Sequence, residues 1–283
     1  MHLSKIHLGF VFGLLAALTN AFNPIFIKWA ASVSNETMVF VRFLVGLLFV
    51  LPGLFTGKVK FHAQYIGKHA WRAVVGIGGI YCFFFSVKYL PIVDAVTLQN
   101  TSPLFVPILY FFSRKVVIPK WEIFGLVIGF LGVLLILRPG ADLRNWACAI
   151  AVLGGLFAAM GQMGVRALSK VESLETMMLY YFLIATVVSL PAMLYTWKPI
   201  EDPTMWIWLI CIGMASCALQ YFKTKSLIYA PATKVSVLVY LGVIFGGFFG
   251  WWLFNEVPSY WAIGGIVLII GGSLLTLFSE KKK

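Results

Sequence analysis

The stretch YLPIVDAVTLQNTSPLF at residues 89–105 recurs in outline 140 residues later as YAPATKVSVLVYLGVIF at residues 229–245. The shared positions pair Tyr89 with Tyr229, Pro91 with Pro231 and Leu98 with Leu238. Further along the chain, the same offset pairs Trp121 with Trp261, Gly125 with Gly265 and Gly132 with Gly272. Before the stretch, an offset of 139 pairs Glu36-Thr37-Met38 with Glu175-Thr176-Met177, Phe43 with Phe182, and Pro52 with Pro191. The chain is therefore predicted to be a duplication of residues 1–140 and 141–283.

Each copy contains five apolar stretches, and a helix needs about 20 such residues to cross the hydrocarbon core of a bilayer. The ten predicted spans are 6–28, 36–55, 70–90, 92–112, 121–138, 146–168, 174–196, 204–226, 231–254 and 258–278. Runs of this length exclude the strands of a membrane barrel, which are about 10 residues long with alternating polarity. We therefore expect an all-α integral membrane protein with ten transmembrane helices.

Five is an odd number, so the second copy is expected to enter the membrane from the opposite side. Two inverted copies packed together form the architecture that exposes a midplane site to either face in turn. The duplication therefore predicts a secondary transporter for a small polar organic solute. A channel or lipid scramblase is the alternative, which a continuous polar stripe through several helices would favour.

Composition and charge support a membrane location. Only 11% of the residues are charged and 61% are hydrophobic, whereas about a quarter of the residues are charged in a soluble domain. The net charge of +12 does not indicate nucleic acid, because the cations are concentrated in connections on one side. With the N-terminus in the cytoplasm, 16 cations lie on the cytoplasmic side, Arg72 and Lys223 among them, and five on the outer side. The positive-inside rule then places both termini in the cytoplasm, as in a bacterial inner membrane.

The first span has one other interpretation. Lys5 before an apolar run, with small residues near Ala21, also resembles a secretory signal. The run is longer than the 7 to 15 residues that are typical of a signal core, and cleavage would leave one copy of the duplication without its first helix.

Several motifs resemble the drug/metabolite transporter superfamily, in its EamA-type form with two repeats of five helices. They are Arg42-Phe43 with Pro52, Leu90-Pro91 through Ser102-Pro103-Leu104-Phe105, Gly125 to Gly132, Ala230-Pro231, Leu253-Phe254-Asn255-Glu256, and Trp261 to Gly272. The resemblance implies transport of amino acids, nucleosides, drugs, choline-like cations or S-adenosylmethionine. Family members usually carry a glutamate after helix four as well as after helix nine, but here Val116 stands opposite Glu256.

Polar residues deep in a span are functional candidates because they are costly in lipid. The densest run is Gln99-Asn100-Thr101-Ser102, halfway along span 92–112 and followed by Pro103, which should kink the helix. Gln99 and Asn100 are candidate substrate contacts, with hydrogen bonding between helices as the other use of membrane amides. The same two interpretations apply to further candidates, with packing as the alternative for the aromatic residues: Asn20, Asn23, Tyr81, Phe85, Gln162, Gln220, Tyr221 and Tyr240.

Arg42 lies about six residues inside the outer end of span 36–55. Because arginine binds carboxylate or phosphate through a bidentate fork, it is a candidate anchor for an anionic group on the cargo. Alternatively, Arg42 reaches the outer interface or pairs with Asp94 or Glu256, which are candidate gate residues at the outer helix ends.

No Asp or Glu lies near the middle of any predicted span. Proton and sodium carriers generally need a carboxylate on the path, so exchange or facilitated movement is expected. No HExxH or GxSxG motif is present and the cysteines show no CxxC spacing, so the sequence indicates no enzyme, metal site or cofactor. The expected partners are the solute and membrane lipids, and the oligomeric state is open.

Overall fold

The computed structural model describes residues 2–55, 63–114, 119–137, 143–229 and 241–279. All regular elements of this part are helical. They are α1 (His2–Trp29), α2 (Asn35–Val50), α3 (Pro52–Phe55), η1 (Ala63–Tyr65), α4 (Ile66–Tyr89), α5 (Ile92–Gln99), α6 (Ser102–Arg114), α7 (Lys120–Leu137), α8 (Leu143–Leu168), α9 (Leu174–Thr196), α10 (Thr204–Tyr229), α12 (Leu241–Phe254) and α13 (Tyr260–Ser279).

Seven segments of the described chain are long and apolar enough to cross a membrane, and three shorter apolar helices accompany them at 123–136, 241–254 and 260–275. Large apolar side chains such as Val127, Leu194 and Val267 stay exposed, as suits a surface that meets lipid. The protein is therefore a multi-pass membrane protein. The count of ten crossings stays a prediction, because residues 231–240 of the predicted ninth span lie outside the described part.

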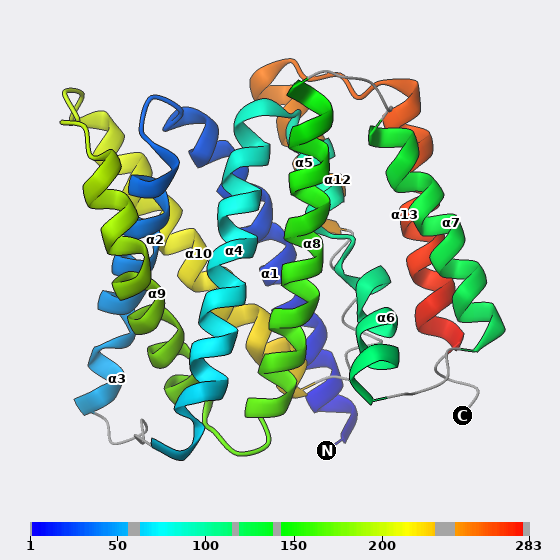
Figure 1. Cartoon of the computed structure of the whole chain (residues 1–283), viewed down its shortest axis with the longest axis horizontal. Helices are drawn as coiled ribbons and strands as arrows, with labels where there is room; N and C mark the ends of the chain where they lie inside the picture. The colour runs from blue at the N-terminus through cyan, green and yellow to red at the C-terminus, as the bar shows by residue number, and fades with distance from the viewer. Residues whose placement is uncertain (1, 56–62, 115–118, 138–142, 230–240, 280–283) are drawn as a thin grey trace.

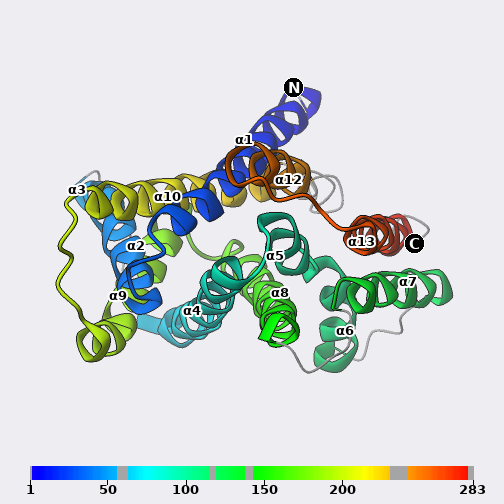
Figure 2. The ribbon, with the colours of Figure 1, turned by 90° about the horizontal axis from the view of Figure 1, so that it is seen from above.

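The helices form an elongated bundle in which α2 and α9 lie at one end and α7 and α13 at the other (Figure 2). Within it, α1 packs against α10 and α4 against α8. Helix α1 begins and α13 ends on the same side (Figure 1), called the terminal face below. On the other side, called the opposite face, α1 ends and α5 begins.

Glycines allow α7 and α13 to pack backbone against backbone. A Cβ added to Gly132 would lie 2.6 Å from the Gly265 carbonyl oxygen, and one added to Gly265 would lie 2.7 Å from the Gly132 carbonyl oxygen. A Cβ at Gly272 would likewise overlap the Gly125 carbonyl oxygen. Small residues are the usual means of such close approach in membranes.

Helices α2 and α9 begin with the same capping contact. The Ser34 side chain accepts a hydrogen bond from the Thr37 N–H at 3.3 Å, and the Ser173 side chain accepts one from the Thr176 N–H at 3.2 Å. Each serine satisfies a backbone donor that the first helical turn leaves without a partner. The two caps occupy positions that the 139-residue offset pairs with each other.

Candidate functional site

The span predicted at 92–112 is broken at Asn100 and Thr101 into α5 and α6. The Thr101 hydroxyl donates to the Leu98 carbonyl oxygen at 2.6 Å, so the side chain competes with the helical hydrogen bonding of its own backbone. Pro103 then follows in the first turn of α6, a position where proline is tolerated. The helix is therefore interrupted by a turn at 100–101, just before the proline at which the sequence predicts a kink.

Two consecutive glycines of α8, Gly154 and Gly155, pack against the chain between α5 and α6. A Cβ at Gly154 would overlap the Gln99 side-chain oxygen, and one at Gly155 would overlap the Thr101 hydroxyl and lie 3.0 Å from the Leu98 carbonyl oxygen. The absence of side chains on α8 thus makes room for Gln99 and Thr101.

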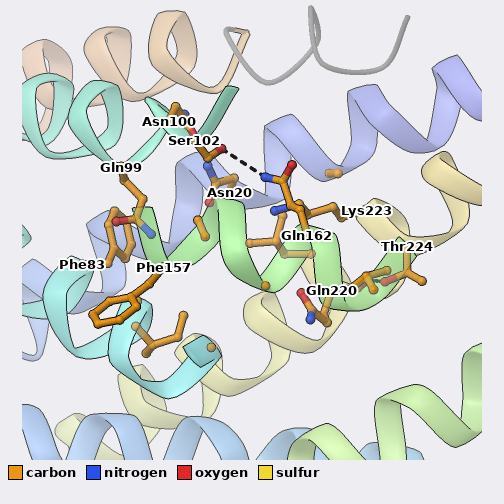
Figure 3. A pocket seen from close by; sticks show the side chains of 18 of the residues that line it. Asn20, Phe83, Gln99, Asn100, Ser102, Phe157, Gln162, Gln220, Lys223 and Thr224 are labelled. Atoms are coloured by element: carbon orange, nitrogen blue, oxygen red, sulfur yellow. Dashed lines mark hydrogen bonds between the residues drawn. The ribbon is translucent and has the colours of Figure 1, made fainter. Parts of the chain in front are cut away.

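A cavity of about 190 Å³ opens beside the break. It is lined by one face of each of several helices (Figure 3). The lining residues include Gly13, Ala16, Ala17, Asn20 and Asn23 of α1, Arg42 of α2, Arg72, Val75, Gly76, Gly79, Ile80 and Phe83 of α4, Phe157, Ala158, Gly161, Gln162 and Val165 of α8, and Leu219, Gln220, Lys223, Thr224 and Ser226 of α10. On α8 and α10 these positions all lie in the half of the helix nearer the terminal face.

Amides from separate helices meet around the cavity. The Asn23 side-chain oxygen accepts a hydrogen bond from the Ser216 hydroxyl at 2.8 Å. The Gln162 amide donates to the Ser102 hydroxyl at 3.1 Å, and Figure 3 shows the two side chains pointing toward each other. These bonds join α1 to α10 and α8 to α6, so some amides serve helix contacts while they also face the cavity.

The structure brings together most of the sequence candidates. The lining includes Asn20, Asn23, Arg42, Gln99, Asn100, Gln162 and Gln220. Tyr81, Phe85 and Tyr221 are not among the described lining residues: Phe85 packs against Tyr89, and Tyr221 against Phe222. Tyr240 lies outside the described residues. A role in binding substrate stays a prediction for all of these positions.

Arg42 does not extend to the outer interface, and the structure corrects that interpretation. The residue is only 5% exposed, and its guanidinium carbon lies 5.6 Å from the Phe43 ring centre and 5.8 Å from that of Phe84. The pairing with Glu256 is also wrong, because Glu256 binds Lys28 instead. Helices α4, α9 and α10 all pack against α2, and Arg42 lies against Phe84 of α4.

Sequence reasoning missed Arg72 and Lys223, which it assigned to the cytoplasmic side. Both line the cavity. Arg72 is 2% exposed and donates from Nη1 to the Met177 carbonyl oxygen at 2.8 Å. The available signal was helical spacing: Arg72 shares a face with Gly76 and Gly79, and Lys223 with Gln220.

Glu256 joins three helices at the opposite face. It pairs with Lys28 at the end of α1, and its other oxygen accepts the Ile92 N–H of α5 at 2.7 Å. Asn255 makes this reach possible with a φ of 52°, a left-handed conformation that asparagine tolerates, so the chain turns back directly after α12. We call Lys28, Ile92 and Glu256 the α1–α5–α12 junction. Asp94, the other predicted gate residue, is buried in the first turn of α5.

One protein family matches the chain twice, once in each predicted half. The EamA-like transporter family matches residues 7–138 and again residues 145–278. The pseudopaline exporter CntI of Pseudomonas aeruginosa is 28% identical over 275 residues, covering 95% of this chain and 96% of the exporter. A riboflavin transporter of Vibrio cholerae is 28% identical and covers 88% of this chain and 85% of its own length.

Two further matches extend over almost the whole chain. An S-adenosylmethionine uptake transporter of Rickettsia bellii is 24% identical, covering 99% of this chain and 97% of the relative. A solved crystal structure superposes with a TM-score of 0.69 at 14% identity, covering 97% of this chain and 98% of its own. That last likeness concerns the fold alone.

Proposed function

Because this chain belongs to the EamA-like transporter family, we propose that it is a secondary transporter that moves a small polar organic metabolite by alternating access. The observation that carries the proposal is the cavity: amides, hydroxyls and cations converge in the middle of helices that are otherwise apolar. Polar groups at such depth are costly and are typical of a substrate path. The relatives are named for chemically different solutes, so they support the class of activity and leave the cargo open.

The proposed scaffold has ten crossings in two inverted repeats, residues 1–140 and 141–283. Two contacts support it, because exchange of the halves converts each into another contact of the structure. The α1–α10 contact becomes α8–α4, and the approach of Gly132 to Gly265 becomes that of Gly272 to Gly125.

Alternating access requires a cavity that is closed at one end. On α8 and α10 the cavity lining lies in the half of the helix nearer the terminal face, and on α1 it lies mostly in the other half, while the α1–α5–α12 junction ties three helices together at the opposite face. Without Arg72 and Lys223, which line the cavity, two of the 16 cations drop out, and the predicted charge bias of 14 to 5 still favours a terminal face in the cytoplasm of a bacterial cell. In the proposed cycle this arrangement is the inward-facing state, and outward opening has to separate Glu256 from Lys28 and Ile92.

Exchange is the proposed mode of transport because the described cavity lining contains no Asp or Glu. The buried pair His69 and Glu172, with 3.8 Å between its nitrogen and oxygen atoms, and the buried Asp94 lie outside that lining. A proton carried directly beside the cargo therefore has no acidic group to hold it.

Counterflow in vesicles tests the transporter proposal. The purified full chain is reconstituted, and uptake of labelled uridine, riboflavin, glutamate and S-adenosylmethionine is measured with and without the same solute preloaded. We expect at least one solute to show saturable uptake that preloading accelerates. Uptake that rises linearly with concentration and ignores preloading would indicate a channel, and uphill accumulation abolished by a protonophore would overturn exchange.

Reporter fusions test the orientation. Reporters at Lys58 and Lys283 should read cytoplasmic, and one at Asp142 should read external. An external reading at Lys283 would overturn the even number of crossings.

A further inference from the structure

Three cations from three helices line the same cavity: Arg42 of α2, Arg72 of α4 and Lys223 of α10. Tyr181 of α9 lines the cavity as well. The Arg72 guanidinium carbon lies 4.9 Å from its ring centre, and Arg42 lies within electrostatic range of its hydroxyl. Lys223 lies within electrostatic range of Arg72. The positive charges therefore form one cluster.

This cluster has no counter-charge in the described lining. None of the described lining residues is Asp or Glu, and the sequence 230–240 contains neither. Arg42 and Arg72 are 5% and 2% exposed, respectively. A buried charge is costly unless it is paired, so the resting cavity holds positive charge that an anion would stabilise.

Hydrogen-bond donors without a partner also favour an anionic ligand. Among the described residues, Arg42 Nε, Arg72 Nη2, Asn23 Nδ2 and Asn100 Nδ2 are buried without a hydrogen-bond partner. The Asn23 amide oxygen accepts the Ser216 hydroxyl, which leaves Nδ2 as the donor without a partner. Gln99 Oε1 is the acceptor among the lining atoms left in that state. Donors thus predominate, as recognition of carboxylate or phosphate oxygens requires.

The cavity also has an apolar part. Phe83 of α4 and Phe157 of α8 line it close to Gln99 (Figure 3). A solute that fills both parts carries an anionic group together with a planar or apolar body.

We propose that the cargo is an organic anion, with a carboxylate or phosphate bound by Arg42, Arg72 and Lys223 and its apolar body against Phe83 and Phe157. This proposal rests on the proposed transport function, whose cargo class it specifies. The two arginines bind oxygen pairs through their forks, and Lys223 acts as a point charge.

Three ligands of nearly equal size and shape test the charge preference: benzoate, its neutral isostere benzamide, and the benzamidinium cation. Phenyl phosphate adds the second anionic group. Their affinities for the purified full chain are measured by thermal-shift titration. We expect one of the anions to bind at least about tenfold more tightly than benzamide, as hydrogen bonds to charged groups imply, and benzamidinium to bind most weakly. Anions that bind no better than benzamide, or not at all, overturn the proposal.

Variants then assign the preference to the cluster. Arg42→Gln and Lys223→Gln should each weaken binding of the preferred anion about tenfold and leave benzamide unchanged. Lys225→Gln is the matched control, because Lys225 is two residues away on α10 and stacks on Tyr221, 4.5 Å from the ring centre, outside the described lining. Equal affinities in Lys223→Gln, Arg42→Gln and Lys225→Gln would overturn the assignment. Arg42→Lys keeps the charge without the fork and should restore part of the affinity.

Binding in nanodiscs of two lipids distinguishes a soluble anion from a lipid headgroup. Comparison of binding with counterflow distinguishes the anion site from the transport function. Nanodiscs of pure phosphatidylcholine contain no anionic headgroup, so equal affinity there and in phosphatidylglycerol discs assigns the site to a soluble anion. Weaker binding in phosphatidylglycerol at a salt concentration that screens the surface charge of the disc assigns it to a lipid headgroup and overturns the soluble cargo. Because these experiments measure binding, failure of counterflow alone would contradict transport and leave the anion site standing.

Discussion

The two copies of the duplication keep the same residues where α7 contacts α13, but they differ in the wall of the cavity. At the contact, paired positions keep the same residue, Gly125 with Gly265 and Gly132 with Gly272, and each glycine approaches the other helix. Around the cavity, paired positions differ: Arg42 with Tyr181, Ile80 with Gln220, and Phe83 with Lys223.

The difference reflects what each region requires. Backbones in contact leave no room for a side chain in either copy, whereas a cavity wall only has to suit the cargo. In these three pairs, one copy supplies a charged or amide group and the other an aromatic or aliphatic one. A nearly symmetric scaffold can thus present an asymmetric site that holds its cargo in one direction.

The largest expected effect concerns the glycine contact. Gly272→Ala places a Cβ 2.8 Å from Gly129 Cα, a backbone atom that cannot move aside cheaply, so we expect a loss of about 1–3 kcal/mol in stability and a clearly lower Tm. Gly271→Ala is the control, because a Cβ there meets no atom within 4 Å. Thermal unfolding in detergent measures both, and equal Tm values would show that close packing is not what keeps these glycines.

A second prediction concerns the α1–α5–α12 junction, where the copies differ because Val116 is aligned with Glu256. Glu256→Gln removes the ion pair with Lys28 and weakens the bond to the Ile92 N–H, so the closed opposite face should lose stability. We expect counterflow to become about tenfold faster, because outward opening has to break these contacts and hydrogen bonds to charged groups are worth about 1.5–3 kcal/mol. Glu201→Gln, an exposed carboxylate between α9 and α10, should leave the rate unchanged. Equal rates in both variants would remove the junction from the mechanism.

A third prediction exchanges the paired wall residues. The double variant Phe83→Lys with Lys223→Phe keeps the total charge and moves one cation to the other copy. If the site holds its cargo in one direction, affinity for the preferred benzoate or phenyl phosphate should fall several-fold. The anionic group of the bound ligand would then meet the new phenyl ring on α10, and its apolar body would meet the new lysine on α4. Affinity at the original level would show that only the total charge of the cavity matters.

The smallest expected effect concerns the paired helix caps. Ser34→Ala and Ser173→Ala each remove one capping hydrogen bond, at a cost of about 1 kcal/mol. Because the two caps have nearly equal geometry and lie on different helices, the losses should be equal and add in the double variant. Chemical denaturation measures the three free energies of unfolding. A clear difference between the single variants would show that the copies have diverged in stability as well as in the cavity.

Gln220 and Tyr221 show that the sequence does not predict which face of a helix meets the cavity. Both were candidates, and adjacent residues point about 100° apart on a helix, so one face of α10 cannot present both. Only Gln220 lines the cavity, together with Lys223. Spacing tells which residues share a face, but the helices that cover the other faces are distant in sequence.

By itself, the sequence determined the membrane class and predicted a kink in mid-span, because apolar length and local proline chemistry act within one segment. It also identified the amides at the cavity, because polar groups in lipid need a reason. Only the tertiary structure turned Arg42 inward, placed Arg72 and Lys223 beside it, and brought Glu256 to Lys28 and Ile92. These relations depend on which helix faces meet when α1, α4, α8 and α10 pack. The packing partner of a helix can lie more than a hundred residues away in sequence, as α10 does from α1.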